Sequence, residues 1–224
     1  MRPTLDAILW AGPRAFDGAP PADAIARALG ARRWLALPVD VRHRFTAHAP
    51  VVYRGHTQTH LSLAGRFFAW CLALLGAPLP PFAGEAEATV EVSPVDGGMS
   101  WARRYRGPLG LAFTVRSIKR LAEDGRLLEC CGGGWTMLLD LDVENGVLVF
   151  RSRKFFWRWG PISVPLALAL TPGQAEVRHE DLGGGRFRFT LTFDHPWFGR
   201  TVEQDGVFED PQYQCDRAKM PGRH

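Results

Sequence analysis

Trp101, Arg103 and Tyr105 stand at every second position of the sequence and could together recognise a charged group. Side chains two positions apart share one face of a strand, so the guanidinium of Arg103 would lie between two aromatic rings. Inside a barrel, an unpaired charge costs several kcal/mol and would need a carboxylate or an anionic ligand. Facing water, the same side chain would make only a cation–π contact of about 0.5–1 kcal/mol. The spacing is compatible with a pocket wall and with a solvated strand face.

Two carboxylates, Glu129 and Glu176, are candidate partners for Arg103, because both lie in other extended segments of the same region. In an enzyme, either carboxylate or His43 would act as general acid or base, while Arg103 would stabilise developing negative charge. His195 follows a core-like segment and is a candidate ligand-binding residue, together with Trp101, Arg103 and Tyr105.

Metal and nucleophile signatures are weak. His56 and His60 are four residues apart, a metal-ligand spacing on a helix, but no third ligand or catalytic glutamate accompanies them. Cys130 and Cys131 are adjacent, so on a strand they point to opposite faces, one expected in the core and one weakly exposed. No serine nucleophile elbow is present. We therefore expect no metal and no cofactor.

Aromatic and basic residues alternate between positions 150 and 159, with five aromatic rings and four cations. Rings combined with cations occur in platforms for single-stranded nucleic acid, at membrane surfaces and at barrel mouths. Basic residues elsewhere are interleaved with acids and never form a run of five. We expect packing and pocket lining here and no nucleic-acid partner, with membrane-surface contact as an open alternative.

Composition fits a folded protein: 224 residues, 46% hydrophobic, net charge +4. No N-terminal stretch has the order of a secretory signal, and four cysteines without such a signal are expected to be reduced. The longest apolar run, 67–75, is too short to span a bilayer, for which about 18 residues are needed. These features predict a cytoplasmic protein without a transmembrane segment.

Helical patterns are confined to residues 1–85. A first helix is predicted from Pro20–Pro21 to Gly30, a second from Pro38, and a third over 58–75, where apolar residues form one stripe. The proline-rich segment 76–84 is predicted to be a linker.

From residue 87 onward the hydrophobic period changes to two. In 186–193, Phe187, Phe189, Leu191 and Phe193 are predicted to be buried, and the alternate Arg186, Arg188, Thr190 and Thr192 exposed. Asn145–Gly146 suits a type I′ turn. Residues 154–171 break the period and suggest a short strand, a loop and a helical turn. Nine strands are predicted, at 88–93, 100–106, 111–119, 126–131, 135–142, 146–153, 174–181, 186–193 and 200–208.

Successive strands joined by short turns predict an antiparallel meander, and a meander of this length curls. The fold class expected is α+β, mainly β: N-terminal helices followed by a lipocalin-like barrel or half-barrel. Residues 1–208 would form one domain (helical 1–85, β 86–208), with 209–224 as a tail. We expect it to bind a small hydrophobic or amphiphilic molecule inside the barrel. A cofactor-independent cyclase, isomerase or hydrolase is the alternative.

Six short motifs follow one another along the chain: Leu37–Pro38 with Val41 and His43, Tyr53–Arg54–Gly55, Trp101-x-Arg103-x-Tyr105, Gly125-x-x-Leu128–Glu129, Gly160–Pro161 to Val164–Pro165, and Pro196-x-Phe198–Gly199 with Asp205–Gly206. In this order they resemble a bacterial family called domain of unknown function 4166, over about residues 30–208. The resemblance implies that the domain occurs either as a free-standing protein or attached to dehydrogenase-like nucleotide-binding domains. The resemblance implies no catalytic residues, and the glycine-rich nucleotide fingerprint is absent from this sequence.

Overall fold

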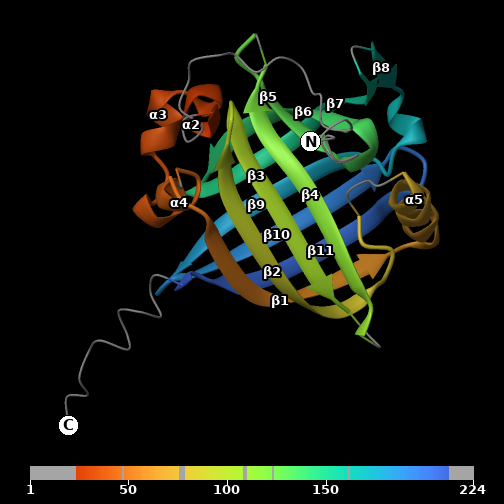
Figure 1. Ribbon diagram of the computed structural model, residues 1–224, viewed down its shortest axis with the longest axis horizontal. Coiled ribbons are helices and arrows are strands. Elements are labelled where there is room, and N and C mark those ends of the chain that lie inside the picture. The colour runs from red at the N-terminus through yellow and green to blue at the C-terminus, as the bar shows by residue number, and fades with distance from the viewer. Residues whose placement is uncertain are drawn as a thin grey trace, which may run out of the picture.

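The computed structural model describes residues 24–46, 48–75, 79–107, 110–122, 124–160 and 162–211. Within these ranges ten antiparallel strands close into a barrel, which confirms the predicted curled meander (Figure 1). An eleventh strand, β8 (Ile162–Leu166), pairs with β7 outside the ring. The ring strands are β1 (Val51–Leu61), β2 (Gly84–Val95), β3 (Gly98–Arg106), β4 (Ala112–Leu121), β5 (Leu127–Cys131), β6 (Trp135–Glu144), β7 (Val147–Trp159), β9 (Gln174–Gly183), β10 (Arg186–His195) and β11 (Gly199–Glu209).

All nine predicted strands are present, because the alternation and the turn residues agree along this part of the chain. Asn145 and Gly146 join β6 to β7 with φ angles of 52° and 82°, the positive values expected of the predicted turn. Where the period breaks, β7 continues to Trp159, and β8 and the 3₁₀ turn η4 (Leu168–Leu170) follow. Another 3₁₀ turn, η3 (Gly132–Gly134), joins β5 to β6.

The predicted helix over 58–75 is wrong in its first part, as is the helical assignment of all of 1–85. Residues 51–61 form β1, which lies between β2 and β11 and closes the barrel. Its inward side chains include Thr57 and Thr59, so the sequence of β1 lacks the alternation of apolar and polar residues that predicts a strand. The helix that follows, α5 (Leu63–Leu74), begins where the Ser62 hydroxyl accepts a hydrogen bond from Gly65 N–H at 3.1 Å.

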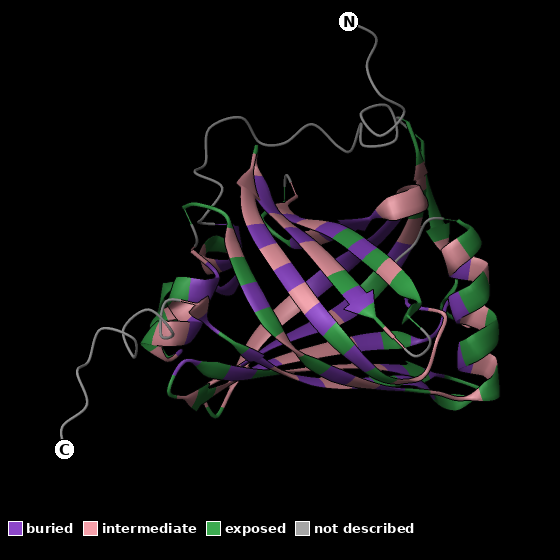
Figure 2. Cartoon of the chain, turned by 60° about the horizontal axis from the view of Figure 1, so that its bottom comes forward, coloured by how far each residue is buried: buried purple, intermediate pink, exposed green. Residues whose placement is uncertain are grey.

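Helices cover both ends of the barrel (Figures 1 and 2). At one end lie α2 (Ala24–Leu29), α3 (Ala31–Leu35) and α4 (Val39–Arg44), and α4 follows Pro38 as predicted. The ring of Phe45 closes this end, 5.4 Å from that of Trp101. The opposite end carries α5, and no helix in the described ranges is long and apolar enough to cross a bilayer. The predicted helix start at Pro20–Pro21 and tail residues 212–224 lie outside these ranges.

The burial of β10 follows the predicted alternation only in part. Phe187 and Phe193 are buried and Arg188 is exposed, as expected. Phe189 and Leu191 are half-buried because they border a cavity in the barrel. The alternate residues Thr190 and Thr192 are half-buried as well, rather than exposed.

Candidate functional site

Strand β3 turns Trp101, Arg103 and Tyr105 into the barrel. Trp101 and Tyr105 are 6% and 5% exposed, and the Arg103 side chain is 14% exposed. The intervening Arg104 points outward and forms an ion pair with Glu91 at 3.1 Å. Of the two orientations considered for Arg103, the inward one is present.

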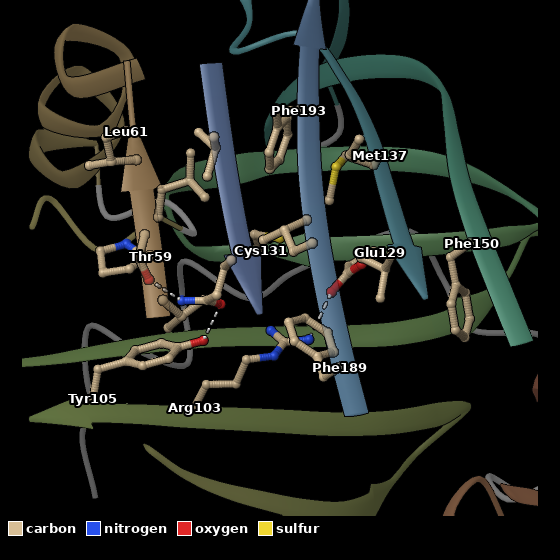
Figure 3. A pocket seen from close by; sticks show the side chains of 18 of the residues that line it. Thr59, Leu61, Arg103, Tyr105, Glu129, Cys131, Met137, Phe150, Phe189 and Phe193 are labelled. Carbon is tan, nitrogen blue, oxygen red and sulfur yellow. Dashed lines mark hydrogen bonds and ion pairs between the residues drawn. The ribbon is translucent and has the colours of Figure 1, made fainter. Parts of the chain in front are cut away.

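A buried charged cluster surrounds the head of Arg103. Strand β5 supplies Glu129, and β4 supplies Lys119 and Ser117. The Lys119 Nζ donates to Glu129 Oε1 at 2.8 Å, and Arg103 Nη2 lies 3.6 Å from the same oxygen. Arg103 Nη1 donates to Ser117 Oγ at 3.3 Å. Figure 3 shows Arg103 and Glu129 pointing toward each other across the interior.

The neighbouring cations keep Glu129 ionised. Burial alone would raise its pKa, but the charges of Lys119 and Arg103, with hydrogen bonds from Lys119 and Ser117, lower the pKa to about 2. At neutral pH this carboxylate accepts hydrogen bonds and holds no proton to donate.

The cluster contains two cations and one carboxylate. Burial lowers the pKa of Lys119 more than the charge of Glu129 raises it, while their 2.8 Å contact stabilises the ammonium. His179 lies on the same interior surface. Burial, followed by the charges of Arg44, Lys119 and Arg103, lowers its pKa to about 3, so it is neutral at pH 7. With Lys119 protonated, the cluster has one more positive than negative charge.

Two cavities lie on either side of Arg103. The larger, about 50 Å³, extends toward the α5 end and includes Leu79 and Phe193 in its wall. The smaller, about 30 Å³, extends toward α4 and includes Phe45. At roughly 10–15 Å³ for each water, the larger holds about three to five water molecules. Both cavities share five wall residues: Arg103, Tyr105, Phe150, Val177 and Phe189.

A chain of hydrogen bonds closes one side of the larger cavity. The Tyr105 hydroxyl donates to Gln204 Oε1 at 3.2 Å, and Gln204 Nε2 donates to Thr59 Oγ1 at 2.8 Å (Figure 3). Burial raises the pKa of Tyr105, so the phenol stays protonated. These groups satisfy one another, so among the described residues the unsatisfied donors of the larger cavity wall are mainly those of Arg103.

A protein-family model described as Domain of unknown function (DUF4166) matches residues 37–208, which is more than half of the chain. The chain belongs to this family. The match confirms the resemblance drawn from the six motifs, and no curated protein matches the chain. Because the family description names no activity, an assignment of function for this DUF4166 chain depends on the geometry of its own residues.

Glu176, the second candidate partner for Arg103, lies outside the barrel. It shares β9 with the inward-facing Val177 and therefore points the other way. Glu176 Oε2 accepts from Arg151 Nε at 2.7 Å, and its Oε1 lies 3.3 Å from Arg178. The prediction that Glu176 is a partner of Arg103 is therefore wrong, and Glu176 belongs to an ion-pair network on the outer surface.

The two candidate histidines are also outside the cavities. His43 is exposed on α4, on the face of that helix away from buried Val41 and Arg44. His195 is buried at the end of β10, but it packs against aromatic rings near α5 and is absent from both cavity walls. Both histidines were chosen as candidates because they adjoin apolar segments in the sequence. That position indicated the burial of His195 correctly, but neither side chain borders a cavity.

Both thiols of Cys130 and Cys131 are buried, so the expectation of one exposed thiol is wrong. Burial raises the pKa of each, which keeps them protonated and weakly nucleophilic. His56 and His60 lie on the outer face of β1. In the described part of the chain, no three His, Cys, Asp or Glu side chains form a group that could hold a metal ion.

The sequence reasoning missed Lys119, although a signal was available. The β4–β5 turn is centred on Asp124, and residues equidistant from a hairpin turn face each other. Lys119 and Glu129 are both five residues from Asp124, and the structure pairs them. Counting outward from the turn would have identified the cation that holds Glu129.

Proposed function

We propose that the barrel binds a small amphiphilic molecule with an acidic head group, and that Arg103 receives the head. The observation that supports this most directly is the position of Arg103 in the wall shared by both cavities, within a cluster where Arg103 and Lys119 share a single carboxylate. A charge buried without full compensation costs several kcal/mol, so an anion is favoured there.

The hydrogen-bonding capacity of Arg103 supports an oxygen-bearing head. A guanidinium has five N–H donors, and the polar contacts described for this one are Ser117 Oγ at 3.3 Å and Glu129 Oε1 at 3.6 Å. Lys119 is the closer partner of Glu129, because its Nζ donates to the same carboxylate oxygen at 2.8 Å. A ligand carboxylate would offer Arg103 two acceptors in the planar arrangement that a guanidinium favours.

The remaining cavity wall supports an apolar body. Val115, Met137 and Phe193 contribute buried or half-buried apolar surface around the larger cavity, and few polar groups interrupt it. Half-buried Phe189 and Leu191 can be covered further by a ligand. At about 50 Å³, far below the roughly 300–1,000 Å³ of a drug-sized ligand pocket, the larger cavity favours a short, slim alkyl body.

Binding is favoured over catalysis by the state of the carboxylates. Glu129 has a pKa of about 2 and is held by two cations, which makes it a poor general acid and a weak base at neutral pH. Glu176 and His43, the other two candidates for proton transfer, do not line either cavity.

The test is calorimetric titration of the full chain with straight-chain carboxylates of two to ten carbons, with the matching alcohols as neutral probes. Arg103→Met keeps most of the side-chain volume and removes the charge. Because a hydrogen-bonded charge contributes about 1.5–3 kcal/mol, the variant should weaken carboxylate binding roughly 10- to 150-fold. Alcohol binding should change much less.

Arg104→Met is the matched control, since Arg104 is the next residue of β3 and points outward. It should bind the carboxylates as the unaltered protein does. Native mass spectrometry of the purified protein should in addition reveal a copurified acidic amphiphile. A folded Arg103→Met protein with unchanged carboxylate affinity, or no binding across the whole series, would overturn the proposal.

A further inference from the structure

The outer face of α5 is apolar. Its large exposed residues follow one another at intervals of four, three and four, which places them in a single stripe. Gly65, Ala69 and Leu72 form the opposite stripe and are buried against the barrel (Figure 2). A surface helix normally turns charged or polar residues to water, so this helix has a second apolar face to cover. The exposed stripe is Leu63 (85% exposed), Phe67 (65%), Trp70 (59%) and Leu74 (84%).

Two other segments expose large apolar residues. One comprises the β7–β8 hairpin and η4, where Trp159 is 84% exposed. The other is the β10–β11 turn, where Trp197 is 73% exposed. Further exposed apolar residues of these segments are Trp157, Ile162, Val164, Leu168, Leu170 and Phe198.

His195 holds these segments together at one end of the barrel. Its ring stacks on Phe68 of α5 at 5.5 Å and on Phe198 at 4.6 Å. Trp197 N–H donates to His195 Nδ1 at 3.1 Å, so the Nε2 proton is directed to the Ala169 carbonyl of η4 at 3.2 Å. Figure 1 likewise places α5 and β8 on one side, away from α2–α4. We call residues 63–75, 157–160, 162–170 and 197–198 the apolar collar.

In and beside the apolar collar, the charged side chains without a described ion-pair partner are positive. The sequence has no Asp or Glu in residues 62–84 or 145–175. Arg66, Lys154 and Arg158 lie in these stretches, and none of them forms an ion pair with a described carboxylate. The carboxylate next to the β10–β11 turn, Asp194, is paired with Arg200 at 2.7 Å.

From this combination we infer that the apolar collar docks the protein on the surface of an anionic phospholipid bilayer. Trp side chains, apolar residues and cations are the set that partitions into the interface of such a membrane. Each cation near an anionic leaflet raises a partition coefficient about fivefold. A second copy of the chain fits less well, because an isologous contact would bring two sets of the cations Arg66, Lys154 and Arg158 into one interface with no acidic residue in the collar segments to pair with them.

The collar also surrounds the end of the barrel toward which the larger cavity extends. Leu61 and Leu79 of that cavity lie beside α5 in the fold, and Phe193 precedes His195 by two residues on β10. Docking would bring this end to the bilayer, the source of acidic amphiphiles. This last step rests on the proposed function, whereas docking itself does not.

The experiment is flotation of the full chain with two kinds of vesicle: phosphatidylcholine alone, and equal parts phosphatidylcholine and phosphatidylglycerol. We expect binding to the anionic vesicles, at least tenfold weaker binding to the neutral ones, and loss of that difference in 1 M salt. Brominated lipids should quench the tryptophan fluorescence of the bound protein.

Phe67→Ser combined with Trp159→Ser should lower the partition coefficient at least tenfold, and both residues are exposed enough to change without unfolding the barrel. Leu35→Ser is the matched control: Leu35 is 67% exposed, close to the 65% of Phe67, but lies on α3 at the other end. Arg103→Met should float as the unaltered protein does, which separates docking from ligand binding.

Absence of flotation with anionic vesicles would overturn the inference. So would equal losses for the collar variant and for Leu35→Ser. Light scattering that shows a dimer abolished by the collar substitutions, without vesicle binding, would assign the surface to a second copy instead.

Discussion

Replacing Glu129 with glutamine removes the negative charge of the buried cluster while keeping the size of the side chain. Lys119 and Arg103 would then be buried with no carboxylate within 4 Å among the contacts described for them. Breaking a buried ion pair by removal of one partner costs about 3–5 kcal/mol. The pKa gives a second route to the magnitude. A change from the ordinary 4.5 to about 2, at about 1.4 kcal/mol per pH unit, corresponds to about 3 kcal/mol.

The pH dependence has a defined sign. The folded-state pKa of Glu129 is depressed, so its contribution is present above the unfolded value of 4.5 and is lost as pH falls through about 2. The difference in unfolding free energy between the unaltered protein and Glu129→Gln should therefore be about 3 kcal/mol at pH 7. It should shrink steadily between about pH 5 and pH 2.

The assay is urea denaturation of both proteins at a series of pH values, followed by tryptophan fluorescence. Glu91→Gln is the control, because Glu91 pairs with Arg104 on the outer surface, where such pairs contribute about 0.2–1 kcal/mol. A Glu129→Gln protein within 1 kcal/mol of the unaltered protein at pH 7, or a difference that does not change down to pH 2, would refute the reasoning.

Two further predictions concern the α4 end of the barrel. Phe187→Ala should lower the unfolding free energy by about 3–5 kcal/mol, because its buried ring stacks on His179 and Phe208. Arg188→Ala, at the next and exposed position, should lower it by about 0.5 kcal/mol or less. Equal midpoints in the denaturation curves of the two variants would contradict this prediction. Asp181→Asn should cost about 3 kcal/mol, because Arg44 is 1% exposed and pairs with Asp181 at 2.6 Å. Thermal denaturation checks it, and a melting temperature unchanged from that of the unaltered protein would show that the buried guanidinium is compensated elsewhere.

Most of the barrel was predictable because its strands satisfy two independent signals, alternation and turn chemistry. β1 lacked the first: its inward positions include Gly55, Thr57 and Thr59, which carry little apolar signal. Its neighbours β2 and β11 are distant in sequence, so no hairpin turn marked it either. A strand defined only by its partners cannot be recognised from its own residues.

The candidate site was predictable in the same uneven way. Trp101, Arg103 and Tyr105 were found by spacing alone, since a period of two fixes a common face. Glu176 could have been excluded, because it alternates with Ala175 and Val177, which face inward. Glu129 could not be assigned a face by alternation, because the segment Leu127–Cys131 is apolar on both sides. Its inward direction follows only from its pairing with Lys119 across β4 and β5.

The pairing of β1 with β11 has a consequence for how the barrel folds. The two strands that close the ring are separated by the whole length of the meander, so the last step of closure has a high contact order and is slow. During synthesis, hairpins from β2 to β7 can assemble as soon as they leave the ribosome, while the free edge of β1 waits for β11. Until then, that edge can pair with another nascent chain. The edge of β1 is therefore open to aggregation until translation is nearly complete, and slower elongation would lengthen this interval.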